Sequence, residues 1–219
     1  MNFENIKNDI ENRALGLDDA FQFGCKSCGK CCREKVIMLN PYDIFQLTKH
    51  LNMSQAEFAH KYCGFTIGKD SNLPIVYLDF KGGSCPFLVN KRCSVHKVKP
   101  FVCASYPLGR AISGDRLLYF RQEVSCGNRY DKQVVRDWVY GSRNAEEEEQ
   151  IYLVWSQILQ MLVPITSRIP DNEIAPVANM LGNNLYFSYD LLKPFLPQLE
   201  IRLEDTKFIV ERLKLKYGE

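Results

Sequence analysis

The pattern of hydrophobic and polar residues changes near residue 140 of this 219-residue chain, from short apolar runs to helical spacing. In the first part the apolar residues come in short runs. Over 73–80, for example, Ile75 and Tyr77 alternate with Val76 and Leu78, and this period of two predicts a strand. Shorter strands are predicted over 36–39 and 117–124, with a turn over 81–84.

Helix signals also occur in the first part. Asn40 followed by Pro41 is typical of a helix start, and Ile44, Leu47 and Leu51 then share one face. The spacing of Ser54 and Glu57 is a capping-box pattern that predicts a second helix, ending near residue 62. Further helices are predicted over 3–15 and 131–140.

After residue 144 the pattern becomes helical. Four glutamates, residues 146–149, suit the positive end of a helix dipole, and apolar residues then recur at helical spacing from Ile151 to Leu162. Pro164 and Pro170 are expected to break this helix, and more helix is predicted over 175–195 and 198–216. The aromatic side chains of this part are assigned to a core or an interface: Tyr186, Phe187, Tyr189 and Phe208.

These patterns predict an α+β fold. Residues 1–140 form a small cysteine-rich metal-binding module with short strands, and residues 141–219 form a helical extension packed on it. No apolar run reaches the roughly 18–20 residues that a membrane helix needs, and the first ten residues are polar and acidic where a signal peptide would be apolar. We therefore expect a cytoplasmic protein with no membrane contact, whose thiols are kept reduced.

Charge is distributed unevenly along the chain. Residues 25–126 hold 15 Lys and Arg against 7 Asp and Glu, whereas residues 141–219 hold 8 against 12. A basic environment lowers the pKa of thiols and offsets the charge of thiolates, which is the favoured explanation. A nucleic-acid partner is the alternative, but no helix or arm is rich enough in arginine to favour it.

The densest chemistry is the segment 25–32, Cys-Lys-Ser-Cys-Gly-Lys-Cys-Cys. Two residues between cysteines is the spacing of a metal knuckle, in which a turn directs both sulfurs to one ion. The side chains of the adjacent Cys31 and Cys32 are expected to diverge. Further cysteines follow at positions 63, 85, 93, 103 and 126, and apolar residues such as Phe87 and Phe101 would shield a centre from water.

The arrangement Cys-x2-Cys-x2-Cys-Cys, then Cys-Pro-Phe-Leu, Cys-x-Val-His and Pro-x-x-Cys, resembles the YkgJ-type cysteine-cluster family from Cys25 to Cys126. That family is described as a zinc- or iron-chelating domain, and flagellin lysine N-methylase is its named enzymatic member. Many relatives have arginine where this chain has Lys99 and Ala104. The resemblance implies eight metal ligands: Cys25, Cys28, Cys31, Cys32, Cys85, Cys93, Cys103 and Cys126.

Two nearby residues are assigned other roles. Cys63 lies outside the motif and is expected to be a small buried hydrophobic residue. His96 could complete a zinc site, but relatives often have tyrosine there, so a structural role is favoured. His50 and His60 fall on predicted helices and are taken as ordinary surface or core residues.

The identity of the metal stays open. An iron–sulfur cluster, [4Fe–4S] above all, is favoured over zinc because of the apolar residues near the later cysteines. A thiol redox system is the third hypothesis. The resemblance also implies S-adenosylmethionine as a cofactor if the chain is an enzyme.

Three functions are compatible with these features. The first is a metal-binding protein. The second is a protein-lysine N-methyltransferase, and the third is a structural zinc module for protein interaction. The last two require a protein substrate or partner. No glycine-rich nucleotide loop is found. Tyr106, Tyr119 and Asp79 are weighed as catalytic groups, but each is better explained by a structural role.

Overall fold

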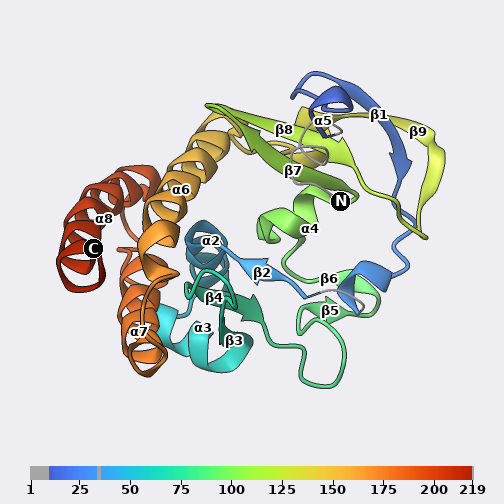
Figure 1. Ribbon diagram of the computed structural model, residues 1–219. Coiled ribbons are helices and arrows are strands. Elements are labelled where there is room, and N and C mark those ends of the chain that lie inside the picture. Colours follow the sequence, from blue (N-terminus) through green and yellow to red (C-terminus); the bar gives the residue numbers. More distant parts are fainter. Residues whose placement is uncertain (1–9, 34–35, 219) are drawn as a thin grey trace.

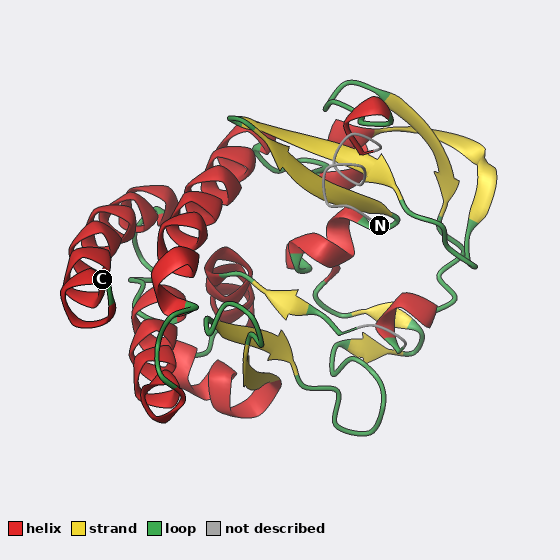
Figure 2. Ribbon diagram, in the orientation of Figure 1, coloured by secondary structure: helices red, strands yellow, loops and turns green. Residues whose placement is uncertain are grey.

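Two hydrophobic cores lie on either side of a cavity in this computed structural model, which describes residues 10–33 and 36–218. Short antiparallel strands form small sheets, and helices make up the C-terminal region (Figures 1 and 2). The α+β class predicted from the sequence is therefore confirmed. The division into two domains at residue 140 stays a prediction.

The first core begins with a three-stranded sheet and two helices. The strand order is β2–β4–β3, with β2 at Met38–Leu39, β4 at Pro74–Leu78 and β3 at Cys63–Ile67. Helices α2 (Pro41–Leu51) and α3 (Gln55–Tyr62) both open with complete capping boxes, from Asn40 with Asp43 and from Ser54 with Glu57. The local sequence signals for both helix starts and for the alternating strand β4 are confirmed.

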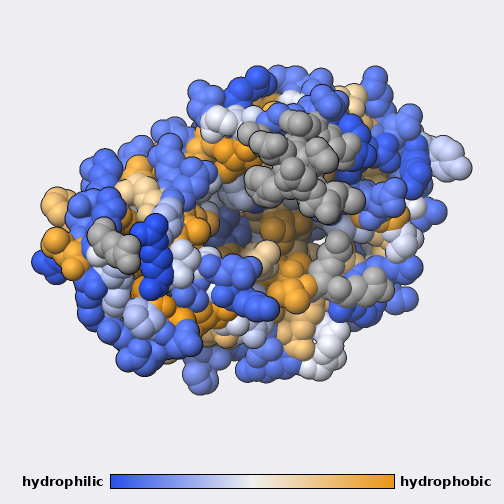
Figure 3. Space-filling view, in the orientation of Figure 1, coloured by the Kyte–Doolittle hydropathy of each residue, from blue (hydrophilic) through white to orange (hydrophobic). Residues whose placement is uncertain are grey.

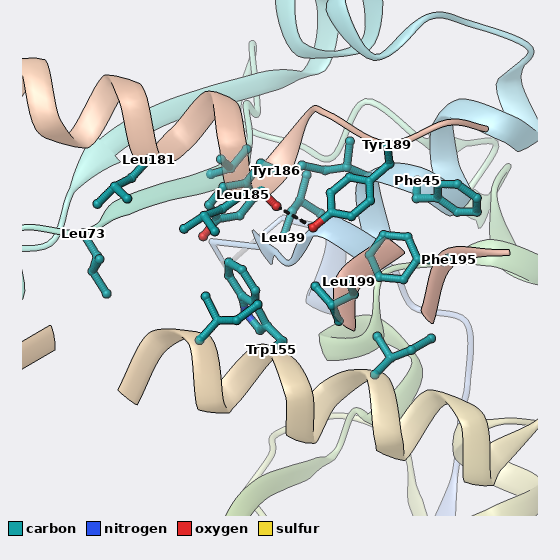
Figure 4. Packing of buried hydrophobic residues seen from close by; sticks show 14 of the residues in the cluster. Leu39, Phe45, Leu73, Trp155, Leu181, Leu185, Tyr186, Tyr189, Phe195 and Leu199 are labelled. Atoms are coloured by element: carbon teal, nitrogen blue, oxygen red, sulfur yellow. Dashed lines mark hydrogen bonds between the residues drawn. The ribbon is translucent and has the colours of Figure 1, made fainter. Parts of the chain in front are cut away.

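Three long helices complete this core: α6 (Ala145–Thr166), α7 (Asp171–Tyr186) and α8 (Phe195–Tyr217). Figure 4 shows side chains of these helices converging with Leu39 and Phe45 from the first part of the chain. The Trp155 and Tyr186 rings meet edge to face at 5.2 Å. Residues 37–98 and the C-terminal helices thus share one apolar interior.

Pro164 does not end α6, contrary to the prediction. The helix continues to Thr166, whose side chain is fully buried; its hydroxyl donates to the Ser71 carbonyl oxygen at 2.6 Å and lies 3.0 Å from the Leu162 carbonyl oxygen. A proline in the last turn removes a single helix hydrogen bond, and the buried anchor at Thr166 holds the turn in place. Pro170 does not end α6 either, because the helix stops four residues earlier; this proline instead directly precedes the first residue of α7.

The second core lies under two antiparallel strand pairs. One pair, the β1–β9 ribbon, joins β1 (Ala20–Gly24) to β9 (Asn128–Val134), and the other joins β7 (Leu108–Ser113) to β8 (Arg116–Arg121). Helices α4 (Phe101–Ser105) and α5 (Val135–Val139) pack beneath them. The helix predicted over 131–140 is therefore wrong in its first half. Most of β9 is exposed, so pairing with β1 decides its conformation without an alternating apolar pattern.

The remaining described elements are short. They are the 3-10 turns η1 (Lys30–Cys32) and η2 (His96–Val98), and a hairpin of β5 (Leu88–Val89) with β6 (Arg92–Cys93). Of the helix predicted over 3–15, residues 10–12 are helical and residues 3–9 lie outside the described residues. None of the helices in the described part of the chain has the length and apolar character needed to cross a bilayer.

Candidate metal centre

A cavity of about 610 Å³ lies between the two cores. Apolar side chains are visible within the hollow between the upper and lower parts of the molecule in Figure 3. The structure brings all eight motif cysteines to the lining of this one cavity, although they are spread over a hundred residues of sequence: Cys25, Cys28, Cys31, Cys32, Cys85, Cys93, Cys103 and Cys126. Clefts between two packed units are where proteins most often hold ligands.

The segment 25–32, here called the knuckle, turns sharply through residues with positive φ. Ser27 has φ 49° and Gly29 has φ 71°, a conformation that glycine adopts without strain. The Ser27 backbone N–H donates to the Cys25 sulfur at 3.4 Å. The expected divergence of the last two cysteines is wrong. Their sulfurs lie 3.9 Å apart, because η1 curls both side chains toward the cavity.

One side of the cavity, here called the core wall, belongs to the first core. Cys85, Cys93 and Cys103 all pack against that core. Its nearest aromatic residue, Phe87, is only 3% exposed. The Cys85 backbone N–H donates to the Cys32 carbonyl oxygen at 2.7 Å, so the end of the knuckle is fastened to this wall.

Asp43 positions the part of the core wall that carries Cys103. One carboxylate oxygen of Asp43 accepts from the Phe101 backbone N–H at 2.9 Å, at the start of α4, and the other accepts from the Asn40 N–H at 3.0 Å. A single buried carboxylate therefore caps both α4 and α2. The Arg110 guanidinium lies 3.0 Å from the centre of the Phe101 ring and adds a positive charge near Asp43.

The opposite side, here called the ribbon wall, is formed by the β1–β9 ribbon and α5. Gly24 pairs with Asn128, which brings the next residue, Cys25, beside the segment holding Cys126. Gly127 packs so tightly here that a Cβ would lie 2.9 Å from the Gly24 carbonyl oxygen. The Tyr106 hydroxyl and the Cys126 sulfur form a hydrogen bond of 3.1 Å.

The thiols differ in their exposure to solvent. Cys25 and Cys28 are exposed, whereas the other six are half-buried. Burial raises the pKa of the Cys103 thiol, and also that of Cys85 and Cys93, where backbone N–H groups of neighbouring residues partly offset the effect. For Cys32 the hydrogen bond with Cys31 is the largest cause of a raised pKa, followed by burial.

Basic side chains also line the cavity. Lys26, Lys91, Arg92 and Lys99 lie on the lining, and Asp137 is the one carboxylate among the lining residues that the structure describes. Burial lowers the pKa of Lys99, and the nearby thiols Cys103 and Cys93 act against that shift. This placement agrees with the interpretation that the basic excess of the segment offsets thiolate charge. Neither Lys91 nor Arg92 was singled out from the sequence, because nothing local marks a hairpin tip as part of a distant cavity.

Other residues considered from the sequence fall in different places. Tyr106 and the exposed His96 line the cavity. Tyr119 does not; its hydroxyl is hydrogen-bonded to Tyr140 at 2.6 Å and donates to Glu149 at 2.8 Å inside the second core. Asp79 forms an ion pair with Lys81 at 3.8 Å, also away from the cavity.

Cys63 lies outside the cavity lining, as expected, and packs against the first core, where burial raises its pKa to about 12. His50 and His60 are exposed on α2 and α3. Cys63 is therefore set apart from the eight cysteines that line the cavity.

The donor set matches thiophilic metals in kind and number. Four cysteine thiolates are the usual shell of an iron–sulfur cluster and of many zinc sites, and this cavity offers eight. The thiols are not gathered into a finished shell, however. Among residues 10–33 and 36–218, no three Cys, His, Asp or Glu side chains already converge on a single ion position.

Comparison with known proteins gives a match to a protein family. Residues 24–127 match the family model CxxCxxCC, described as "Putative zinc- or iron-chelating domain". The matched segment begins at the last residue of β1 and ends just after Cys126, so it contains all eight cysteines of the cavity. No curated protein matches the chain, and no solved structure matches it.

Proposed function

We propose that this chain is a metal-binding protein whose eight cavity cysteines are the ligands, and the match of residues 24–127 to the CxxCxxCC family model supports the proposal. The observation that carries the proposal is the common cavity of these cysteines. Cysteines from the knuckle, the β5–β6 hairpin, α4 and the segment before β9 line a single space. Reduced thiols brought together in this way have metal coordination as their main use.

We further propose that the core wall holds an iron–sulfur cluster. Cys85, Cys93 and Cys103 supply three thiolates there, and the knuckle supplies the fourth from Cys31 or Cys32. The buried side chains of Phe87 and Val95 keep this part of the cavity apolar, and backbone N–H groups of Phe87 and Val95 face the Cys85 and Cys93 sulfurs. Both features tune a bound cluster. A cluster of this kind supplies one-electron transfer when bound.

The chain's own residues have three tasks in this proposal. Asp43 holds α4, and with it Cys103, at a fixed position on the wall. The apolar side chains limit water around the sulfurs. Lys99, which is close to Cys93 and Cys103, offsets the negative charge of the thiolates.

The test is elemental analysis of protein purified without oxygen, counting iron, zinc and acid-labile sulfide per chain. The proposal predicts iron with a matching amount of sulfide, near four of each, and an absorption band that bleaches on reduction. Zinc without iron would overturn the cluster assignment but keep the metal-binding function. Protein that retains neither metal would overturn both. The methyltransferase hypothesis stays a prediction that binding of S-adenosylmethionine can test.

A further inference from the structure

The sequence motif treats the eight cysteines as one set, whereas the structure distributes their thiols over the two walls of the cavity. Cys85, Cys93 and Cys103 pack against the first core, whereas Cys126 packs against the second. The knuckle crosses from one wall to the other, since it starts at the end of β1 and finishes in η1.

The end of the knuckle belongs with the core wall. Cys32 is fastened there through its carbonyl oxygen, which accepts from the Cys85 N–H at 2.7 Å, and the Cys31 sulfur is 3.9 Å from that of Cys32. The charges of Cys85 and Cys103 also act on the Cys32 thiol. Five thiols therefore belong to the core wall, one more than a four-thiolate cluster uses.

The beginning of the knuckle belongs with the ribbon wall. The pairing of Gly24 with Asn128 places the next residue, Cys25, beside the segment that holds Cys126. Cys28 follows Cys25 through a tight turn with positive φ at Ser27 and the N–H of that residue on the Cys25 sulfur, the spacing that directs two sulfurs to one ion.

The Cys126 sulfur is hydrogen-bonded to the Tyr106 hydroxyl. Cys31 and Cys28 both act electrostatically on that hydroxyl, but Cys31 is held at the core wall by its contact with Cys32. Three thiols therefore fall to the ribbon wall, and two of them, Cys25 and Cys28, are exposed to solvent.

We infer that Cys25, Cys28 and Cys126 form a second metal site, which takes an exchangeable thiophilic divalent ion of the zinc type. Three protein ligands leave one position of a tetrahedral ion for a ligand from solution, as in zinc sites that keep an open position. Exposure of two of the three thiols gives the ion a direct path to bulk solvent. The inference rests on the proposed metal-binding function and assigns this half of the cavity to metal exchange or to an incoming ligand.

The experiment adds Zn²⁺ as the probe to protein purified without oxygen. Bound zinc is counted beside iron and sulfide, and its release to a chromogenic chelator is followed. We expect about one zinc per chain in addition to the iron, released in a fast phase. Cys28→Ser and Cys126→Ser should weaken zinc binding more than tenfold and leave iron and sulfide unchanged. Cys63→Ser, which alters a thiol outside the cavity, is the matched control and should change neither metal.

X-ray absorption at the zinc edge supplies a second readout, with three sulfurs and one lighter atom expected around the probe. Four sulfurs would overturn the open position. Loss of iron and sulfide together with zinc in Cys28→Ser would overturn the second site and leave the proposed function intact, because the two walls would then hold one centre. Failure of the wild-type protein to retain added zinc would also overturn it. Fast-exchanging zinc in protein that lacks iron would support the second site and refute the cluster.

Discussion

The two walls of the cavity hold thiols in different ways. The core wall rests on an interior shared by α2, β4 and the three C-terminal helices, and its cysteines are half-buried. The ribbon wall is a two-stranded pairing, and its β9 strand is mostly exposed. Two strands pair in this sheet of the described chain, so the ribbon wall has less hydrogen-bonded support around its thiols than the core wall has. If the proposed sites are occupied, one cysteine motif supplies both a half-buried centre and a more exposed one.

The largest expected effects come from the aromatic residue of each wall that lies closest in sequence to its cysteines. Phe87 and Phe23 are each 3% exposed, line the cavity and belong to the first and second core, respectively. Phe87→Ala and Phe23→Ala should each lower the free energy of unfolding by about 3–5 kcal/mol, measured by urea denaturation. If the walls act separately, Phe87→Ala loses iron and Phe23→Ala loses added zinc. Equal loss of both metals in the two variants would argue against separate walls.

Asp43→Ala should have the next largest effect, because it leaves two buried backbone N–H groups without their acceptor. We expect a loss of about 2–4 kcal/mol in the free energy of unfolding, together with release of iron. Asp43→Asn keeps one of the two acceptor oxygens and turns an amide NH2 group toward the other N–H, so it should lose less stability than Asp43→Ala but still about 1–2 kcal/mol.

The pH dependence separates these two variants further. Burial raises the pKa of Asp43 above its unfolded value near 3.8. The folded protein then binds more protons between the two pKa values, so its stability falls as the pH rises through that window. Asp43→Asn should abolish this part of the slope in unfolding experiments that start near pH 4. An unchanged slope would show that Asp43 does not titrate in this way.

Gly127→Ala should perturb the ribbon wall with a smaller change in the free energy of unfolding. A Cβ at Gly127 would meet the Phe23 ring and the Gly24 carbonyl oxygen, whereas one at Gly82 would meet nothing within 4 Å, and both glycines have positive φ. The control Gly82→Ala therefore carries only the backbone strain. Gly127→Ala should be less stable than this control by about 1–3 kcal/mol and should bind added zinc more weakly. Matching stabilities would mean that the close approach of the two strands is relaxed at no cost.

The smallest effect is expected on α8. Phe208 was assigned from the sequence to a core or an interface, but the side chain is 74% exposed and far from either wall. Phe208→Ser should change the free energy of unfolding by no more than about 0.5 kcal/mol and leave the metal content unchanged. A larger loss of stability would reveal a contact of this face in solution.

Local signals predicted part of the fold well. The capping boxes at Asn40 and Ser54 and the alternation over 73–80 depend on neighbouring residues, and the structure confirms them. Strands β1 and β9 were missed, and residues 131–134 were assigned to a helix, because this pairing joins segments about a hundred residues apart. Strand β7 was missed for another reason: it pairs with β8 across the two-residue turn Gly114-Asp115, a local hairpin signal that was not used. The helix through Pro164 was missed for a reason similar to that for β1 and β9, since a distant contact with Ser71 stabilises its last turn.

The candidate site likewise combines features that local sequence patterns predict with features that depend on distant contacts. Spacing and resemblance singled out the eight cysteines, and the structure gathers them around one cavity, while their role as ligands stays a prediction. Asp43 was missed although its place three residues after Asn40 marks a capping box; its second hydrogen bond, to α4, crosses between distant segments. The partition of the thiols between walls depends on the Gly24–Asn128 pairing and on the Cys85–Cys32 hydrogen bond, which no local pattern encodes.

The most direct test of the two-wall account is a parallel count of iron, sulfide and zinc in Cys103→Ser and Cys28→Ser, both purified without oxygen and then exposed to Zn²⁺. We expect Cys103→Ser to lose iron and sulfide and still to bind zinc at the ribbon wall, whereas Cys28→Ser should keep iron and sulfide and fail to retain zinc. Loss of the same metals in both variants would contradict the two-wall account, because one centre would then span the cavity.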